Sequence, residues 1–204
     1  MRLHTIGDAA IHAALDIFEE ARAKFGPLPE GRRNCLEHLE NFLPGDMKRL
    51  ADLQVVAAVQ PPHMTLDPGG PERDRGPGRV PYLWPLRTLL DRSTVLAFGT
   101  DSPVVDVNSM DVLYSAVTRQ DPGTHEPASG GLPGERIGMA EALRAYTQGS
   151  AASAGRRSEL GTLEAGKLAD IAVLDRNLLA CDADDIQKTK VLATFMGGTC
   201  VFER

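Results

Sequence analysis

The sequence has few cysteines and no long apolar segment. Its three cysteines, Cys35, Cys181 and Cys200, are an odd number and form no CxxC pair. This argues against a disulfide framework and an all-cysteine zinc site, and it favours a reducing compartment such as the cytoplasm. Nowhere do eighteen consecutive apolar residues occur, and residues 1–8 lack an apolar run of signal-peptide length. We therefore expect neither a membrane span nor a recognisable secretion signal.

Clusters of basic residues are also scarce. The 204 residues carry a net charge of −6, and lysine and arginine are scattered except for short pairs such as Arg32-Arg33 and Arg156-Arg157. Such a surface is a poor partner for nucleic acid and for anionic membranes. With 42% hydrophobic and 25% charged residues, the composition is that of a soluble globular protein of one domain, or of one domain with a small appendage.

What the sequence does contain is an alternation of strand and helix patterns. Strands are expected at residues 1–7, 33–39, 55–59 and 95–98, and helical patterns follow the first three of them at residues 8–25, 44–53 and 82–92. The third and fourth of these strands are apolar at every position, which is typical of parallel strands covered on both faces. The order predicts an α/β fold with a parallel sheet.

The pattern changes after Arg156. An apolar strand is expected at residues 171–174, and Gly197-Gly198 separates two further apolar stretches, at residues 191–196 and 199–202. A Gly-Gly pair between two such stretches predicts a β-hairpin. The end of the chain is therefore expected to form a small β element attached to the α/β segment.

Polar side chains follow each strand of the expected parallel sheet. His4 ends the first strand, His38 the second, Gln60 the third and Asp101 the fourth. Imidazole and carboxylate groups are the ligands that a divalent transition metal, most often zinc, prefers, and strand ends carry the catalytic groups of α/β barrels. Simpler interpretations stay open, because a lone histidine can be a hydrogen-bonded core residue, and Asp101 with Ser102 can form a turn that caps the next helix.

Seven motifs extend this pattern over nearly the whole chain. They are His4-Thr-Ile-Gly-Asp8, Leu36-Glu-His38, Gln60-Pro61, Phe98-Gly-Thr-Asp-Ser-Pro-Val104, Ala116-Val-Thr-Arg119, Ala142-Leu-Arg-Ala-Tyr-Thr147 and Leu163-Glu-Ala-Gly-Lys-Leu-Ala-Asp170. In this order they resemble the amidohydrolase superfamily, specifically its YtcJ-like branch (amidohydrolase family three). The resemblance implies that residues 1–157 are the second half of a metal-dependent hydrolase TIM (β/α)8 barrel, strands five to eight. It also implies that residues 158–204 are the carboxyl-terminal part of a composite β-sandwich.

The resemblance further implies a chemistry for the strand-end residues. His4, His38 and Asp101 would bind a divalent metal, with zinc expected and one or two ions in the complete enzyme. Asp101 would also accept a proton from the attacking water and pass it to the leaving amine. Substrates would be small molecules with amide or related non-peptide C–N bonds. The candidate substrate contacts are Gln60, His63 and Arg79. For His63, a solvent-exposed loop histidine is the alternative interpretation.

The resemblance is also incomplete. The family's strand-one His-x-His pair and its strand-four ligand do not occur in this sequence, and a full (β/α)8 barrel needs roughly 250 residues. Two hypotheses stay open. In the first, the chain is the carboxyl-terminal portion of a metal-dependent amidohydrolase, inactive in isolation until the missing amino-terminal half completes it. In the second, it is a catalytically silent, truncated half barrel that self-associates into a homo-oligomer through open sheet edges.

A doubly wound nucleotide-binding domain is a third interpretation, because such domains also alternate strands and helices. The sequence lacks the glycine-rich phosphate loop of that fold. Its glycine pairs, Gly69-Gly70, Gly130-Gly131 and Gly197-Gly198, all lie away from expected strand-to-helix turns.

Overall fold

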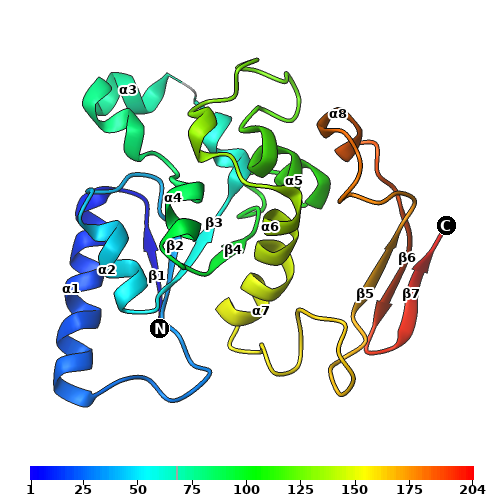
Figure 1. Cartoon of the computed structure of the whole chain (residues 1–204), viewed down its shortest axis with the longest axis horizontal. Coiled ribbons are helices and arrows are strands. Elements are labelled where there is room, and N and C mark those ends of the chain that lie inside the picture. The colour runs from blue at the N-terminus through cyan, green and yellow to red at the C-terminus, as the bar shows by residue number, and fades with distance from the viewer. Residues whose placement is uncertain (68) are drawn as a thin grey trace.

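A computed structural model describes residues 1–67 and 69–204 as an α/β body followed by a small antiparallel sheet (Figure 1). The body is built on a parallel sheet in the order β1-β2-β3-β4. Its strands are β1 (Arg2–Thr5), β2 (Cys35–His38), β3 (Val56–Val59) and β4 (Leu96–Phe98). Strands that are consecutive in sequence are neighbours in the sheet, and helical segments connect them. This confirms the predicted α/β fold with a parallel sheet.

The helices of the body are mostly short. Before β4 they are α1 (Asp8–Phe25), α2 (Asp46–Asp52), η1 (Pro61–Thr65), α3 (Gly70–Arg75), η2 (Pro77–Tyr82) and α4 (Leu86–Asp91). After β4 they are α5 (Ser109–Thr118), η3 (Pro133–Glu135), α6 (Met139–Arg144), the π-helical turn η4 (Ala145–Gly149) and α7 (Ser150–Ser153). Among the described residues, no helix combines the length and apolarity that a membrane crossing requires.

The helix expected over residues 82–92 is shorter in the structure. Helix α4 begins only at Leu86, because Trp84 has a positive φ of 39° and precedes Pro85. A residue before proline is disfavoured in the helical region, so the chain turns here before the helix begins. The connection between β3 and α4 is not a plain loop, since it contains the short helical segments η1, α3 and η2.

One face of the parallel sheet packs against the connecting helices. Leu36 and Leu96 belong to the same buried cluster as Leu15 of α1 and Leu50 of α2. Helix α1 reaches this cluster because its apolar residues recur at helical spacing, so that they form one buried stripe. The body's main hydrophobic core therefore lies between the sheet and its connecting helices.

The opposite face of the sheet carries smaller side chains. Cys35, Val56, Ala58 and Ala97 form a separate buried cluster there. Helix α7 contacts both β3 and β4, and its Ser153 lies with Oγ 3.4 Å from the Sγ of Cys35. We call this face the inner face, and the face packed on α1 and α2 the outer face.

The outer edge of β4 is covered by the chain itself. The carbonyl of Val95 bonds to β3, so the carbonyls of Leu96 and Phe98 point to the other side. There the Ser150 hydroxyl donates to the Phe98 carbonyl at 3.0 Å. A Cβ added to Gly149 would lie 1.8 Å from the carbonyl oxygen of Leu96. The turn from η4 into α7 therefore sits directly on this edge, and only glycine fits at position 149.

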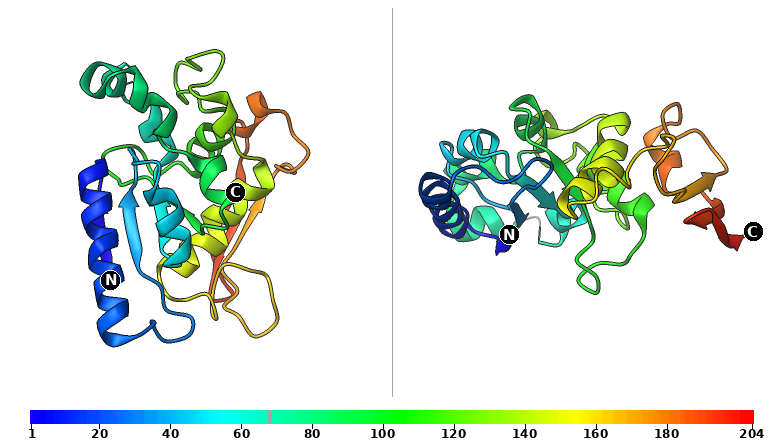
Figure 2. Two further views of the ribbon diagram at one scale, coloured as in Figure 1. Left: turned by 60° about the vertical axis from the view of Figure 1, so that its left-hand side comes forward. Right: turned by 90° about the horizontal axis from the view of Figure 1, so that it is seen from below.

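The small sheet has the order β5-β6-β7, with β5 (Ile171–Leu174), β6 (Val191–Met196) and β7 (Thr199–Glu203). Strands β6 and β7 pair antiparallel on either side of Gly197 and Gly198, which both have positive φ, so the predicted hairpin is confirmed. Between β5 and β6, α8 (Ala183–Ile186) packs on α5 through the buried Ile186. The sheet lies at the end of the molecule away from α1 (Figure 2).

Candidate functional site

The residues at the carboxyl ends of the four parallel strands lie on one edge of the sheet. Thr5 is level with His38 in the β1–β2 pair, and Val59 is level with Phe98 in the β3–β4 pair. Because of this register, the four polar residues predicted at the strand ends lie at the same end of the sheet. They are His4, His38, Gln60 and Asp101. The edge thus brings together segments that are up to about a hundred residues apart in the sequence.

His38 is held in an unusual backbone conformation at this edge. It and Leu39 both have positive φ, 73° and 53°, so the chain leaves β2 by a sharp turn. The imidazole is buried and packs edge-to-face against His4, with ring centroids 4.3 Å apart. Its Nδ1 atom is buried without a hydrogen-bond partner among the described residues. A buried nitrogen with no partner is available as a ligand atom.

Burial, and after it the neighbouring His4 imidazole, lower the pKa of His38 below its ordinary value. The carboxylates of Asp101 and Glu40 act in the opposite direction, and the lowering prevails. His38 is therefore a neutral imidazole at neutral pH, which is the form that binds a metal ion.

Three potential metal ligands gather around this imidazole. One ligand atom from each of His38, His63 and Asp101 lies within 4.8 Å of the other two. The two histidines are buried and the aspartate is exposed, so the group opens to solvent on the side of the carboxylate. We call these three residues the donor cluster.

His63 reaches the cluster from η1, directly after β3. Its side chain is only 6% exposed, so the alternative of a solvent-exposed loop histidine is wrong. One ring nitrogen, Nε2, lies 3.3 Å from the carbonyl oxygen of Thr100, and the other, Nδ1, lies 3.9 Å from a carboxylate oxygen of Glu40. These neighbours fix the ring orientation relative to the loop that carries Asp101.

Asp101 lies in the turn that follows β4, with φ at 56°. The simpler interpretation gave Asp101 and Ser102 a capping role at the next helix. Part of it is correct, because residues 101–104 form a turn in which the Val104 amide donates to the Asp101 carbonyl at 2.9 Å. The capping role is wrong, since α5 is capped by Asn108, which accepts from the Met110 amide at 3.0 Å. The turn uses the backbone carbonyl of Asp101, so its side-chain carboxylate can take part in the donor cluster.

His4 lies beside the donor cluster and outside the group of three. It is exposed on β1, and its ring meets the ring of His38. His38 therefore has two imidazoles as neighbours, because the ring of His63 is stacked with it at a centroid distance of 6.1 Å.

Gln60 takes part in a polar network on the inner face. Its side-chain amide donates to Glu37 Oε2 at 3.4 Å, and the other oxygen of Glu37 pairs with Arg2 at 2.9 Å. The carbonyl oxygen Oε1 of Gln60 is buried without a partner among the described residues. Gln60 therefore offers a free acceptor close to the strand ends.

Arg79, the third candidate substrate contact, forms an ion pair with Asp8 at the start of α1. This pair joins η2 to the segment that follows β1, so it closes part of the rim around the strand ends. The structure therefore brings His63 into the donor cluster and leaves Arg79 at the rim.

Glu40 is the neighbouring residue that sequence reasoning missed. It lies two positions after His38, its carboxylate faces His63, and its electrostatic effect reaches His38. A second acidic residue so close to the Leu-Glu-His motif was the signal that could have indicated it.

The chain is similar to one protein family and to several known proteins. The sequence profile of the amidohydrolase family matches residues 1–202. The protein LONG AFTER FAR-RED 3 of Arabidopsis thaliana is 35% identical over 197 residues, or 96% of this chain. An N-substituted formamide deformylase of Arthrobacter pascens is 30% identical over the whole chain. The solved structure of an uncharacterized metal-dependent hydrolase from Pyrococcus furiosus matches 87% of this chain with a TM-score of 0.71 and 32% identity.

These relatives are much longer than the chain described here. The matches cover 33% of the A. thaliana protein, 36% of the A. pascens protein and 34% of the P. furiosus chain. The chain thus spans about a third of the length of each.

Proposed function

The chain belongs to the amidohydrolase family, and we propose that it supplies the carboxyl-terminal part of the active site of a metal-dependent hydrolase. The reaction would be the hydrolysis of amide or related non-peptide C–N bonds in small molecules. One observation carries this proposal: two buried imidazoles and a carboxylate converge within 4.8 Å at the carboxyl ends of parallel strands.

In this proposal, β1 to β4 correspond to strands five to eight of a TIM barrel, within a unit of residues 1–157. Residues 158–204 contribute to a composite β-sandwich. The parallel strand order and the partial coverage of longer relatives support this correspondence. Barrel enzymes carry their active sites at the carboxyl ends of the strands, where the donor cluster lies.

The residues present fit a divalent metal, for which zinc is the proposed identity. His4, His38 and Asp101 would hold it. Two of them belong to the donor cluster, and the ring of His4 lies against the ring of His38. The buried Nδ1 of His38, which has no partner among the described residues, supports this assignment. A metal bound here would act as a Lewis acid and lower the pKa of a water molecule from about 15.7 towards about 7. One or two ions would bind in the complete protein.

Asp101 is the proposed general base and acid. Its carboxylate is exposed at the open side of the cluster, where it can accept a proton from the attacking water and deliver it to the leaving amine. His63, Gln60 and Arg79 are the proposed substrate contacts. Of these, Gln60 has a buried acceptor that finds no partner in the described part of the chain, and His63 lies in the donor cluster itself.

The activity proposed is that of a complete protein. Since the relatives are about three times as long, the remaining ligands would come from a longer chain or from a separate amino-terminal half. The isolated 204-residue chain would then be inactive.

The alternative function is that of a catalytically silent half barrel that forms homo-oligomers. One observation favours it: Arg2 and His4 of the outermost strand β1 are exposed, and β1 pairs only with β2 among the described residues. Sedimentation distinguishes the two. A well-folded, strictly monomeric chain would contradict the alternative.

Metal content tests the main proposal directly. After exhaustive dialysis, elemental analysis should find about one equivalent of a transition metal per chain, and His38→Ala should abolish it. His125→Ala is the matched control, because His125 is exposed and lies outside the donor cluster. Equal metal content in the His38 variant and the unmodified chain would contradict the proposed site.

Hydrolysis by the complete protein tests the role of Asp101. An N-substituted formamide is the first substrate to try, because one relative bears that activity in its name. Asp101→Asn should lower kcat by about a hundredfold or more, the usual contribution of a general base. Asp106→Asn, an exposed aspartate nearby in the sequence, should retain normal turnover. Normal hydrolysis in the Asp101 variant would overturn the assignment.

A further inference from the structure

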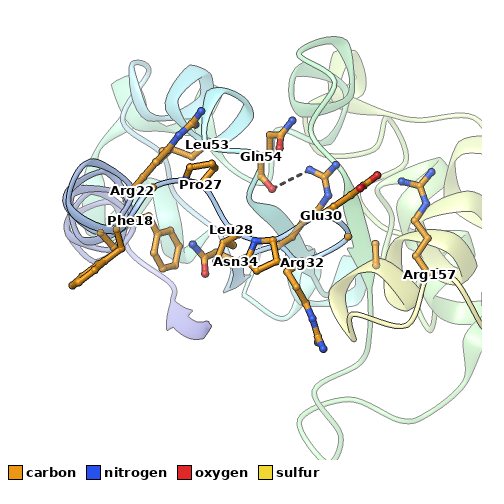
Figure 3. Close-up of a pocket in the computed structure, with 17 residues that line it drawn as sticks. Phe18, Arg22, Pro27, Leu28, Glu30, Arg32, Asn34, Leu53, Gln54 and Arg157 are labelled. Carbon is orange, nitrogen blue, oxygen red and sulfur yellow. Dashed lines mark hydrogen bonds between the residues drawn. The ribbon is translucent and has the colours of Figure 1, made fainter.

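A cavity of about 570 Å³ lies at the other end of the parallel sheet. Its walls come from the last turns of α1, residues 26–34, residues 53–54 before β3, and the end of α7 with Arg157 (Figure 3). These segments adjoin the amino ends of β2 and β3. A four-residue strand is about 13 Å long, so the cavity is separated from the donor cluster by the length of the sheet.

Four arginines line this cavity: Arg22, Arg32, Arg33 and Arg157. Glu30 is the one acidic residue among the lining residues. None of the four arginines makes an ion pair within the described parts of the chain, whereas Arg49 on the outer surface pairs with three carboxylates. A concentration of unpaired positive charge is unexpected in a protein whose net charge is −6.

The arginines approach the cavity from two sides. On one side, Arg22 donates to the carbonyl of Asp52 at 3.0 Å and Arg33 donates to that of Gln54 at 3.1 Å. These bonds orient the guanidinium groups without neutralising them. Arg32 extends across to the end of α7, where its Nη1 lies 3.1 Å from the position of a Cβ on Gly155. Arg157 stands on the same side as α7, opposite Phe18 and Arg22 of α1 (Figure 3).

The remaining lining is largely apolar. Phe18 is buried at one wall, and Leu53 continues this surface towards the sheet. Phe25 and Leu28 are large apolar side chains that stay exposed, at 77% and 49%, at the same cavity. The cavity thus offers both positive charge and apolar surface to one ligand.

We propose that this cavity is a binding site for an organic phosphate monoester with an aromatic or aliphatic body. Guanidinium groups bind phosphate oxygens in a bidentate manner, and a dianion matches four arginines and one glutamate better than a monoanion does. The volume lies within the usual range of small-molecule sites, roughly 300–1,000 Å³. The ligand is distinct from the substrate of the proposed hydrolase, because the site lies at the opposite end of the strands.

Calorimetric titration of the 204-residue chain tests this with three probes. 1-Naphthyl phosphate carries both the charged head and the apolar body, inorganic phosphate carries the head alone, and 1-naphthol carries the body alone. The expected result is saturable binding of 1-naphthyl phosphate that is at least about tenfold tighter than that of either part. Absence of saturable binding, or equal binding of 1-naphthol, would overturn the proposal.

Variants locate the binding in the cavity. Arg32→Gln combined with Arg157→Gln should weaken 1-naphthyl phosphate binding by about tenfold or more, whereas Glu30→Gln should tighten it because the opposing charge is removed. Arg92→Gln combined with Arg204→Gln is the matched control, since both arginines are exposed and lie outside the cavity. Circular dichroism verifies that each variant is folded. Unchanged affinity in the folded Arg32 and Arg157 variant would contradict the site.

Binding of 1-naphthyl phosphate in the cavity should not depend on the donor cluster or on a metal bound there. His38→Ala and removal of metal by a chelator should leave 1-naphthyl phosphate binding unchanged. Loss of binding in both experiments would mean that the probe binds at the strand ends, which would overturn the cavity as the site.

Discussion

The outer face of the parallel sheet is filled by large aliphatic side chains, whereas the inner face carries small and charged ones. On the outer face, Leu36 and Leu96 pack with Leu15 and Leu50 into one cluster that is almost fully buried. Helices supplied by this chain complete that cluster. The outer face is therefore a finished core.

The inner face has a different composition. Cys35, Ala58 and Ala97 are small side chains that fill little of the volume above the sheet, and Arg2 pairs with Glu37 beside them. Short helix α7 covers part of this surface. The difference teaches that the larger share of the hydrophobic stabilisation comes from the outer face, while the inner face has a smaller apolar cluster beside charged groups.

The largest expected change in stability comes from truncating one side chain on each face of the sheet. Leu36→Ala should lower the free energy of unfolding by about 2–5 kcal/mol, because it leaves a cavity in a close-packed core. Cys35→Ala, at the neighbouring position on the inner face, should lower it by about 1 kcal/mol. Urea denaturation followed by circular dichroism measures both. Equal losses would mean that the two faces contribute alike.

A smaller effect is expected at the covered edge of β4. Gly149→Ala would place a methyl group against the Leu96 carbonyl, and relief of that overlap should cost about 1–3 kcal/mol of stability. Gly45→Ala is the control, because its φ is −68° and no atom lies within 4 Å of the added Cβ. The same denaturation experiment applies. Full stability of the Gly149 variant would show that the turn does not sit tightly on the edge.

The smallest effect concerns the beginning of the helical segment that covers this edge. The Gly138 amide donates to the Glu141 carboxylate at 2.8 Å, and this bond, followed by the Arg87 ion pair, lowers the pKa of Glu141 against the cost of partial burial. A carboxyl whose pKa is lowered by folding stabilises the protein above its ordinary pKa near 4.5, and this contribution disappears as the pH falls through the lowered value.

Glu141→Gln should therefore reduce stability by about 0.5–1 kcal/mol at pH 7 and by less below pH 4. Denaturation midpoints at the two pH values check this. Glu20→Gln on the exposed surface of α1 should leave both midpoints unchanged. A constant difference between pH 7 and pH 3 would contradict the role given to the Glu141 carboxylate.

Much of the fold could be predicted because two strands of the parallel sheet, β3 and β4, are continuous apolar runs. Residues 55–59 and 95–98 contain the observed strands β3 and β4, and the Gly197-Gly198 pair marked the observed hairpin. His38 and Asp101 could be placed at one edge of the sheet by strand-end position alone. These are local patterns, which a sequence carries directly.

The remaining features depend on contacts between distant segments. The placement of His63 beside Asp101 depends on the short helix η1, which a Pro-rich stretch did not reveal. The arginine cavity could not be expected either, because Arg22, Arg32 and Arg157 lie far apart in the sequence and line one cavity only in the folded chain. Basic residues that are scattered along the sequence can line one cavity in the folded chain, and the sequence alone does not reveal this.

The cover on β4 also has a consequence for synthesis on the ribosome. Ser150, which occupies the Phe98 carbonyl, follows it by 52 residues in the chain. At about 5–20 residues per second, β4 is translated roughly 3–10 s before the segment that covers it. During that interval its backbone groups are open to any strand nearby, including one from another nascent chain. Codon choice or pausing between residues 99 and 149 therefore sets the length of this interval without altering a single amino acid.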